Sequence, residues 1–464
     1  MLAVLESINS FVWGIPALVL ILGVGIYLSI CTGFAQITMF PKALKNFLGQ
    51  FRKKKGQDSE GVSGFQALCT ALAATVGTGN LAGVAGAICI GGPGAIFWMW
   101  VCAIFGMVTK FAEATLAIRF REKNSKGEYV GGPMYIISNG LGKKWDWLAC
   151  LYCFFGVAAA FGVGNATQIN AVIGGLNSVI TAFGGQESVK INLAVGVVLG
   201  IMIASMLLGG AKKIGIVAER LVPFASGAYI LLCAGVLVAR VDALGGAFAA
   251  IFQGAFTPKA VTGGMLGSAF QALRVGASRG VFTNEAGMGT ASIAHAAAKV
   301  DHPADQGLMG IMEVFIDTIV ICTMTALVIL CSGVPIPYGT DVGVTLTTAA
   351  FSEIYGQWVC VLISAALCCF AIATVLGWGL YGVRCAQYLF GDGVWRFFAI
   401  LQAVTVVIGS VLGTQTVWML AETVNGLMAV PNLIALACLS PELIMLTRQY
   451  RKGAWQNATL QRLR

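Results

Sequence analysis

The sequence predicts an all-helical polytopic membrane protein, and three observations indicate this class. Of the 464 residues, 58% are hydrophobic and only 11% are charged, and the mean hydropathy is +0.83. Apolar runs of about 20 residues, the length that crosses a bilayer as a helix, recur along the whole chain. Its 60 glycines suit helices that pack closely in a membrane. Together these features exclude a soluble domain.

The apolar runs predict about eleven spans, each long enough for one membrane helix. Lysine and arginine gather in the loops after spans one, three and five and in the C-terminal tail, whereas the alternate loops hold few. This bias predicts an outside N-terminus and a cytoplasmic C-terminus, and it explains the net charge of +9 without a nucleic-acid partner. The expected spans are 11–35, 62–90, 94–118, 147–181, 191–209, 214–239, 262–290, 306–331, 357–383, 396–413 and 416–446.

The second span is interrupted near its middle. Gly77 and Gly79 flank Thr78 and precede Asn80, and each glycine costs a helix roughly 1 kcal/mol relative to alanine. A broken helix in a bilayer is tolerated only where it is buried or lines a cavity. Its freed N–H and C=O groups can bind an anion and a cation, which is typical of a transporter's substrate site. The alternative is that the glycines only let helices pack closely.

The seventh span, 262–290, is also glycine-rich and has the opposite orientation. It holds Arg274, Arg279 and Glu285, and we expect its part of the site near Gly276. Two interrupted spans, five apart and oppositely oriented, predict an inverted repeat with the site at the midplane. The predicted units are a first helix with its basic loop (1–61), two five-helix repeats (62–240 and 241–447) and a basic tail (448–464).

Polar residues in spans four and nine are further candidates. Phe161 and Gln168 are seven residues apart and share a helix face. The amide of Gln168, buried in the span, needs a hydrogen-bond partner, either a charged group of the substrate or a polar group of another helix. Thr374 either bonds back to its own helix or ligates a hard cation beside the broken helix. Trp378 lies one turn later, away from the interfacial belt, and either lines a cavity or packs.

Ionisable residues inside spans are costly and default to functional hypotheses. Lys110 and Glu113 are three residues apart and are expected to pair with each other. Asp317 is expected to ligate a cation or relay a proton, and Glu285 to act in a gate or a structural ion pair. The two histidines, His295 and His302, are expected in or beside a loop, with no catalytic role.

The run GGPGAIFWMWVCAIFG at 91–106 resembles the signature of the alanine/glycine:cation symporter family, the sodium:alanine symporters. The resemblance extends over most of the chain, and that family belongs to the amino acid–polyamine–cation superfamily. It therefore implies the LeuT fold, with a five-plus-five inverted repeat and one extra first helix. The other matching segments are TVGTGNLAGVAGAI at 75–88, GEYVGGPMY at 127–135, ASRGVFTNEAGMGTASIAHAAAKVDHP at 277–303 and NGLMAVPNLIAL at 425–436.

The resemblance also implies a function. The protein would import a small neutral amino acid, most readily alanine or glycine, across a bacterial or archaeal plasma membrane. Sodium would be the coupling ion and alternating access the mechanism, with no other cofactor and no obligate protein partner. Serine and glutamine stay open as substrates.

The site implied by the resemblance combines the two interrupted regions. Its substrate residues would be the turn Gly77, Thr78, Gly79 and Asn80, with Phe161, Gln168, Gly276 and Trp378 around it. Its sodium ligands would be the carbonyls of Ala73, Val76 and Phe370 and the hydroxyl of Thr374. Two residues depart from the family's pattern: Ala373 stands where a second hydroxyl is usual, and Val383 where an acidic residue is common.

Two other transport classes and one enzymatic class compete with this interpretation. A proton-coupled transporter would use Asp317 or Glu285 as its carrier. An ion channel would not need two interrupted helices in opposed repeats. An integral-membrane enzyme is disfavoured, because no metal-ligand spacing, nucleophile elbow or phosphate loop is present, and the CxxC of Cys150 and Cys153 lies in an apolar run.

Overall fold

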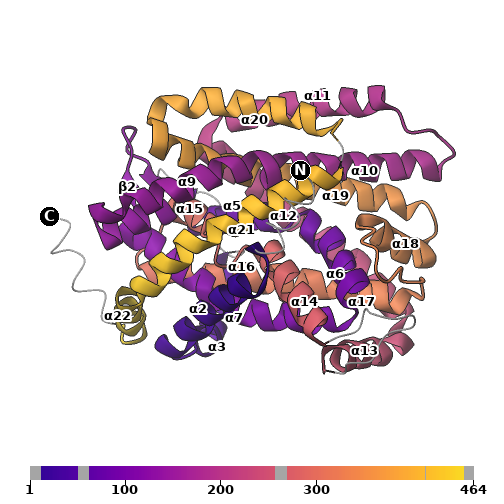
Figure 1. Ribbon diagram of the computed structural model, residues 1–464, viewed down its shortest axis with the longest axis horizontal. Helices are drawn as coiled ribbons and strands as arrows, with labels where there is room; N and C mark the ends of the chain where they lie inside the picture. The colour runs from indigo at the N-terminus through magenta and orange to yellow at the C-terminus, as the bar shows by residue number, and fades with distance from the viewer. Residues whose placement is uncertain (1–11, 51–61, 257–268, 413, 454–464) are drawn as a thin grey trace.

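The computed structural model describes residues 12–50, 62–256, 269–412 and 414–453. Helices make up nearly all of the regular structure in these residues, and the strands form two short two-stranded ladders (Figure 1). The predicted fold class, an all-helical polytopic membrane protein, is confirmed.

The number of spans is not confirmed. Among the described residues, seven helices are long and apolar enough to cross a membrane, or nine if each of two bent helix pairs is one span. Part of the predicted seventh span lies outside the described residues. The bent pairs are Gly64–Thr75 with Gly79–Gly91, at 51°, and Thr423–Cys438 with Ser440–Arg451, at 61°.

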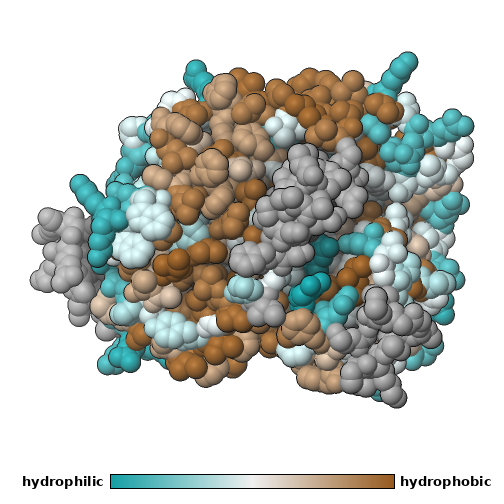
Figure 2. All heavy atoms as spheres, viewed as in Figure 1, coloured by the Kyte–Doolittle hydropathy of each residue, from teal (hydrophilic) through white to brown (hydrophobic). Residues whose placement is uncertain are grey.

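Two peripheral helices carry much of the apolar surface. In α11 (Val189–Leu207) only 17% of the most apolar stretch is buried although its mean hydropathy is 2.0, so its outer face suits lipid. Figure 2 shows hydrophobic side chains across the top of the view, over α11 and α20 (Trp395–Gly409), and polar ones at the left and right edges. The long helices run between these two polar ends (Figure 1).

The first half of the chain contains the interrupted second span. A capping box starts the first half of this span: Ser63 Oγ accepts from the Gln66 N–H and Gln66 Oε1 accepts from the Ser63 N–H, both at 3.1 Å. The elements to the end of span six are α2 (Ile15–Cys31), α3 (Ala35–Thr38), α4 (Phe40–Gln50), β1 (Val62–Ser63), α5 (Gly64–Thr75), η1 (Gly79–Gly83), α6 (Val84–Gly91), α7 (Gly94–Phe120), β2 (Glu122–Lys123), β3 (Tyr129–Val130), α8 (Pro133–Tyr135), η2 (Ile136–Leu141), η3 (Lys143–Trp145), α9 (Asp146–Phe161), η4 (Gly162–Ala166), α10 (Thr167–Ala182), α11 and α12 (Gly210–Ala239).

The second half contains the interrupted seventh span. Strand β1 pairs in parallel with β4, so the start of α5 lies beside the segment that follows α15. The elements are η5 (Val241–Ala243), α13 (Leu244–Phe256), α14 (Ala269–Asn284), α15 (Thr290–Ala296), β4 (Ala298–Lys299), α16 (Pro303–Val314), η6 (Phe315–Cys322), α17 (Thr323–Ser332), α18 (Val344–Tyr355), α19 (Val359–Phe390), η7 (Asp392–Val394), α20, α21 (Thr414–Cys438) and α22 (Ser440–Arg451).

Several helices differ from the predicted spans. The structure adds α4, α13 and α18, which are too short for spans and were not predicted. The predicted last span runs through Leu439, but α21 ends at Cys438 and α22 leaves at 61°. Helix α22 carries Glu442, Arg448 and Arg451, charges that are cheaper to place outside the hydrocarbon.

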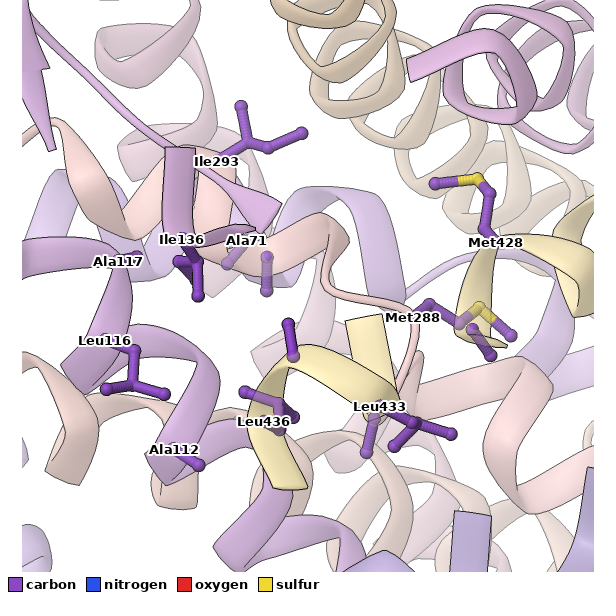
Figure 3. Close-up of a cluster of buried hydrophobic side chains, with 14 of the residues drawn as sticks. Ala71, Ala112, Leu116, Ala117, Ile136, Met288, Ile293, Met428, Leu433 and Leu436 are labelled. Carbon is purple, nitrogen blue, oxygen red and sulfur yellow. The ribbon is translucent and has the colours of Figure 1, made fainter. Parts of the chain in front are cut away.

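The core near the seventh-span interruption is built by α7, α15 and α21. Figure 3 shows Met288, which lies in that interruption, near Leu433 and Met428 of α21. All three side chains are buried in one hydrophobic cluster. Apolar packing against α21 therefore helps to hold the interruption in place.

Candidate functional site

The interruption of the second span is a sharp bend between α5 and η1. Helix α5 ends at Thr75, and Val76 adopts φ −75° and ψ 98°, which is extended rather than helical. Helical structure resumes at Gly79 as the π-helix η1. Isolated π-helical turns within α-helices are frequent at functional sites. The break predicted at Gly77–Asn80 is thus present.

The hydrogen bonds at the bend release two main-chain carbonyls. In a continuous helix the N–H groups of Gly77 and Asn80 would bond the carbonyls of Ala73 and Val76. Instead, Gly77 N–H donates to Asn80 Oδ1 at 2.8 Å, and Asn80 N–H donates to the Gly77 carbonyl at 3.3 Å. The carbonyls of Ala73 and Val76 are therefore available to a cation.

Helix α19 brings Thr374 against this bend. A Cβ atom at Gly77 would lie 2.7 Å from Thr374 Oγ1 and 3.4 Å from Gln168 Oε1, so only glycine fits there without a shift. Thr374 Oγ1 donates to the Phe370 carbonyl at 3.0 Å, the back-bond of a buried helical threonine. That bond uses the hydroxyl proton and leaves the oxygen lone pairs for a further ligand.

Two buried side-chain oxygens beside the bend have no hydrogen-bond partner among the described residues: Thr78 Oγ1 and Gln168 Oε1. Thr78 is fully buried, and Gln168 is 4% exposed. Gln168 Nε2 donates to the Val163 carbonyl at 3.1 Å, so the other end of its amide is fixed. An unpaired buried oxygen costs about 1–3 kcal/mol, which a polar ligand would offset.

Asn80 is fully occupied by the protein. Its Oδ1 accepts from Gly77, and its Nδ2 donates to Asp317 Oδ1 at 2.7 Å and to the Asp317 carbonyl at 3.2 Å. The amide therefore shapes the bend, while its predicted contact with the substrate stays a prediction.

Trp378 is buried one turn beyond Thr374 and packs against the π-helix η4. A Cβ atom at Gly164 of η4 would lie 2.2 Å from Trp378 Cβ, so the two helices touch there through glycine. The indole N–H donates to Glu285 Oε1 at 2.8 Å. Trp378 thus links α19 to the seventh span, and its role as a pocket wall stays a prediction.

Two residues predicted for the substrate site, Phe161 and Gly276, contact other helices and not the second-span bend in the contacts that the structure describes. The Phe161 ring packs on Phe398 of α20, with centroids 5.0 Å apart. Gly276 lies within the continuous helix α14, where a Cβ atom would be 2.2 Å from the Ala95 carbonyl of α7. The seventh span is interrupted at residues 285–289 and not beside Gly276, where we expected its part of the site. Their part in substrate binding is untested.

The end of α14 reaches the second-span bend through a residue that was not predicted. A Cβ atom at Gly79 would lie 2.9 Å from Thr283 Cγ2. The contact between the Thr283 methyl group and Gly79 limits the free volume beside the turn. No sequence signal singles out Thr283, which stands between Phe282 and Asn284 in the run RGVFTNEAG.

The seventh-span interruption is filled by protein carboxylates. Glu113 Oε1 of α7 accepts from the N–H groups of Gly287 and Gly289, at 2.9 and 3.1 Å, and from Asn432 Nδ2 at 2.8 Å. Glu285 has a φ of 54°, and its carboxylate accepts from Thr290 Oγ1 at 2.6 Å and from the Trp378 indole. Protein side chains thus take the donors that this break frees.

The predicted pairing of Lys110 with Glu113 is wrong. Lys110 Nζ pairs with Glu313 Oε1 of α16 at 2.9 Å, while Glu113 turns to the main chain of residues 287–289. Glu313 Oε2 also lies 3.0 Å from His295 Nε2. Tertiary contacts between distant spans decide these partners, and spacing within one helix does not reveal them.

The two histidines lie in ordered, buried surroundings. His295 is fully buried, and its Nδ1 lies 2.6 Å from Gln306 Nε2. His302 caps α16: its Nδ1 accepts from the Ala304 N–H at 2.9 Å. Burial lowers the pKa of His302, which favours the neutral ring that this cap requires. Both have structural roles beyond those expected for loop residues.

Comparisons with known proteins agree with the fold. The fold resembles the solved structure of MhsT in complex with L-phenylalanine, with a TM-score of 0.55 at 16% identity, over 85% of this chain and 99% of that one. This likeness shows the fold, which is the LeuT fold. The matching family and relatives are symporters, so the protein is a transporter and not an enzyme.

The family follows from the sequence matches. The chain belongs to the sodium:alanine symporter family, whose model matches residues 1–462. It is 44% identical to the sodium/alanine symporter AgcS of Methanococcus maripaludis, over 98% of this chain and 99% of that protein. It is 35% identical to the probable sodium/glutamine symporter GlnT of Bacillus subtilis, over 96% of this chain and 89% of that protein.

Proposed function

We propose that this protein imports a small neutral amino acid, foremost alanine or glycine, together with sodium. One observation carries the proposal: at the second-span bend, two released carbonyls, the Thr374 hydroxyl and two unpaired buried oxygens surround Gly77. The family supports sodium-coupled amino acid symport, and the names of the relatives point to alanine and glutamine.

Sodium would bind between α5 and α19. Its ligands would be the carbonyls of Ala73, Val76 and Phe370 and the oxygen of Thr374. Hard cations prefer oxygen ligands, and all four of these are oxygens from the two helices that meet at Gly77. Ala373 adds none, so the remaining coordination would come from water or main chain.

The amino acid would bind at the turn itself. Thr78 offers a hydroxyl that has no partner among the described residues, Gly77 and Gly79 beside it add no side chain, and Gln168 Oε1 would accept from the ammonium. Thr283 against Gly79 leaves little room, which favours a substrate with a methyl group or none. Trp378, Phe161, Asn80 and Gly276 complete the proposed substrate set, as the wall and support of this turn.

Coupling would follow from where sodium binds. An ion held jointly by α5 and α19 would pin the bend to the opposite repeat. A ligand shifts a conformational equilibrium only through different affinities for the two states, and the effect between two ligands is reciprocal. Sodium would therefore raise the affinity for the amino acid in one state of an alternating-access cycle, and the amino acid would do the same for sodium.

The test is uptake of radiolabelled alanine and glycine into liposomes that hold the purified protein. We expect saturable uptake that an inward sodium gradient drives and that a proton gradient alone does not. Uptake that responds only to pH would assign proton coupling instead. Ion conduction without saturable amino acid uptake would indicate a channel.

We propose that the protein lies in a bacterial or archaeal plasma membrane with its N-terminus outside. The loop between β2 and β3 would then be cytoplasmic, and the loop between α10 and α11 external. Cysteines placed at the exposed Lys126 and Gln186 in a cysteine-free background provide the test. An impermeant thiol reagent should label only Gln186→Cys in intact cells, and the reverse pattern would invert the topology. The basic loop around Gly56 lies outside the described residues.

A further inference from the structure

The two interruptions are joined through one buried carboxylate, Asp317. This residue lies in the π-helix η6, in the middle of the span formed by α16 and α17, and is fully buried. The elements η1 and η6 are in contact, so the carboxylate reaches the second-span bend directly. There, Asp317 Oδ1 accepts from Asn80 Nδ2 at 2.7 Å, and Asn80 Oδ1 accepts from the Gly77 N–H.

The second oxygen of Asp317 leads to the seventh-span interruption. Thr318 Oγ1 donates to Asp317 Oδ2 at 2.8 Å and accepts from Asn284 Nδ2 at 3.1 Å. Asn284 Oδ1 in turn accepts from the N–H of Ala286 at 3.0 Å. A continuous chain of hydrogen bonds therefore runs from Gly77 to Ala286, across the two repeats.

The direction of the bonds explains why the centre of the chain is an aspartate. Asn80 and Thr318 both donate toward residue 317, each to a different oxygen of its side chain. An aspartate offers two oxygens to these donors, whereas an asparagine presents one acceptor and one donor.

We propose that Asp317 is a positioning residue that ties the second-span bend to the seventh-span interruption, so that both change conformation as one unit. The proposal deepens the proposed function and rests on it, since the bend is the proposed amino acid and sodium site. Both carboxylate oxygens are already hydrogen-bonded, Oδ1 by Asn80 of the second-span bend and Oδ2 by Thr318, which Asn284 connects to the seventh-span interruption. Asp317 thus acts through Asn80 on the Gly77 turn.

Two single variants test separately the connection of Asp317 to the second-span bend and its connection to the seventh-span interruption. Asp317→Asn places a donor against Asn80 or Thr318 and disrupts the centre. Thr318→Val keeps the shape but removes the hydroxyl that connects Asp317 to Asn284. Hydrogen–deuterium exchange of the substrate-free protein should rise in residues 76–83 and 284–289 for Asp317→Asn, but only in 284–289 for Thr318→Val. Unchanged exchange at 76–83 in Asp317→Asn would overturn the tie.

A swap of the two side chains distinguishes hydrogen bonding from charge at position 317. In Asn80→Asp with Asp317→Asn, residue 80 accepts from Gly77 and from the new amide, whose oxygen still accepts from Thr318. The KM for alanine at saturating sodium should rise at least tenfold in Asp317→Asn, about 1.4 kcal/mol. The swap should restore most of the protection of residues 76–83 from hydrogen–deuterium exchange in the substrate-free protein. Exchange at 76–83 in the swap as high as in Asp317→Asn would overturn the proposal.

Thr325→Val is the matched control for these variants. It removes another buried hydrogen bond of the same span, between Thr325 Oγ1 and Tyr229 at 2.7 Å, outside the chain from Gly77 to Ala286. Its KM for alanine should equal that of the wild type. If the wild type itself shows no sodium-driven uptake, the proposed function fails, while the exchange experiment still decides the tie. If Asp317→Asn does not fold, Thr318→Val and the swap still test it.

Discussion

The interruptions of spans two and seven lie in opposed repeats, but the polar groups at the two breaks differ in their hydrogen-bond partners. At the first, the carbonyls of Ala73 and Val76 are released, and the oxygens of Thr78 and Gln168 have no partner in the described part of the chain. At the second, Glu113 accepts the freed N–H groups and Glu285 the neighbouring donors. One break keeps its polar groups available for ligands, and the other is stabilised from within.

This difference has a simple electrostatic origin. The turn before α15 exposes the N–H groups of Gly287 and Gly289, and unpaired donors are costly in a lipid environment. Glu113 Oε1 accepts from both of these N–H groups. Under the proposed function, the first break would bind the ligands and the second would serve as the frame.

The largest expected effect comes from removing the carboxylate that fills the second break. Glu113→Ala leaves the N–H groups of Gly287 and Gly289 without an acceptor, at about 1–3 kcal/mol each, and leaves Asn432 Nδ2 with only the Gly287 carbonyl. We expect a large fall in the thermal unfolding temperature of the purified protein in detergent. Glu113→Gln keeps one acceptor oxygen and should fall less. Equal stability of Glu113→Ala and the wild type would show that the frame does not depend on this residue.

The next largest effect is expected at the first break, where an added side chain should weaken alanine binding more than it lowers the stability of the fold. In Gly77→Ala the added Cβ would lie 2.7 Å from Thr374 Oγ1. We expect alanine affinity to fall about 100-fold, about 2.8 kcal/mol, measured by equilibrium binding of labelled alanine. The control is Gly174→Ala in α10, where no atom lies within 4 Å of the added Cβ. Equal affinities in the two variants would place the site elsewhere.

A smaller effect tests the bond between Trp378 and Glu285. Trp378→Phe keeps an aromatic ring but deletes a donor to a carboxylate, worth about 1.5–3 kcal/mol. Trp395→Phe is the control, because its indole donates to a neutral carbonyl, that of Leu207, at 3.1 Å. Thermal unfolding in detergent should show the larger loss for Trp378→Phe. A larger loss for Trp395→Phe would argue against a charged partner at Trp378.

The sequence predicted the first break well and the second poorly. Gly77 and Gly79 around a hydroxyl are a local signal, and the bend is where they are. In the seventh span, glycines recur at positions 276, 280, 287 and 289, and the pattern does not say which of them ends the helix. The answer depends on Glu113, which is distant in sequence and reaches residues 287–289 only in the folded protein.

The same limit applies to the ion pairs and the short helices. Spacing within α7 suggested Lys110 with Glu113, but α16 supplies the partner, Glu313. Helices α13 and α18 are shorter than a span, so a search for long apolar runs passes over them. Local composition thus indicated the class and one break, and the resemblance of motifs indicated the family, while contacts between repeats had to come from the structure.

The central claim is that the first break holds the sodium ion, and Thr374 tests it most directly. Thr374→Val keeps the shape and removes the oxygen, and neighbouring Ala373 cannot replace it. Alanine uptake into liposomes is measured against sodium concentration at fixed pH for the wild type, Thr374→Val and the control Thr325→Val. We expect the half-maximal sodium concentration to rise at least tenfold in Thr374→Val alone, about 1.4 kcal/mol of lost ligation. An unchanged sodium curve in Thr374→Val would contradict the account.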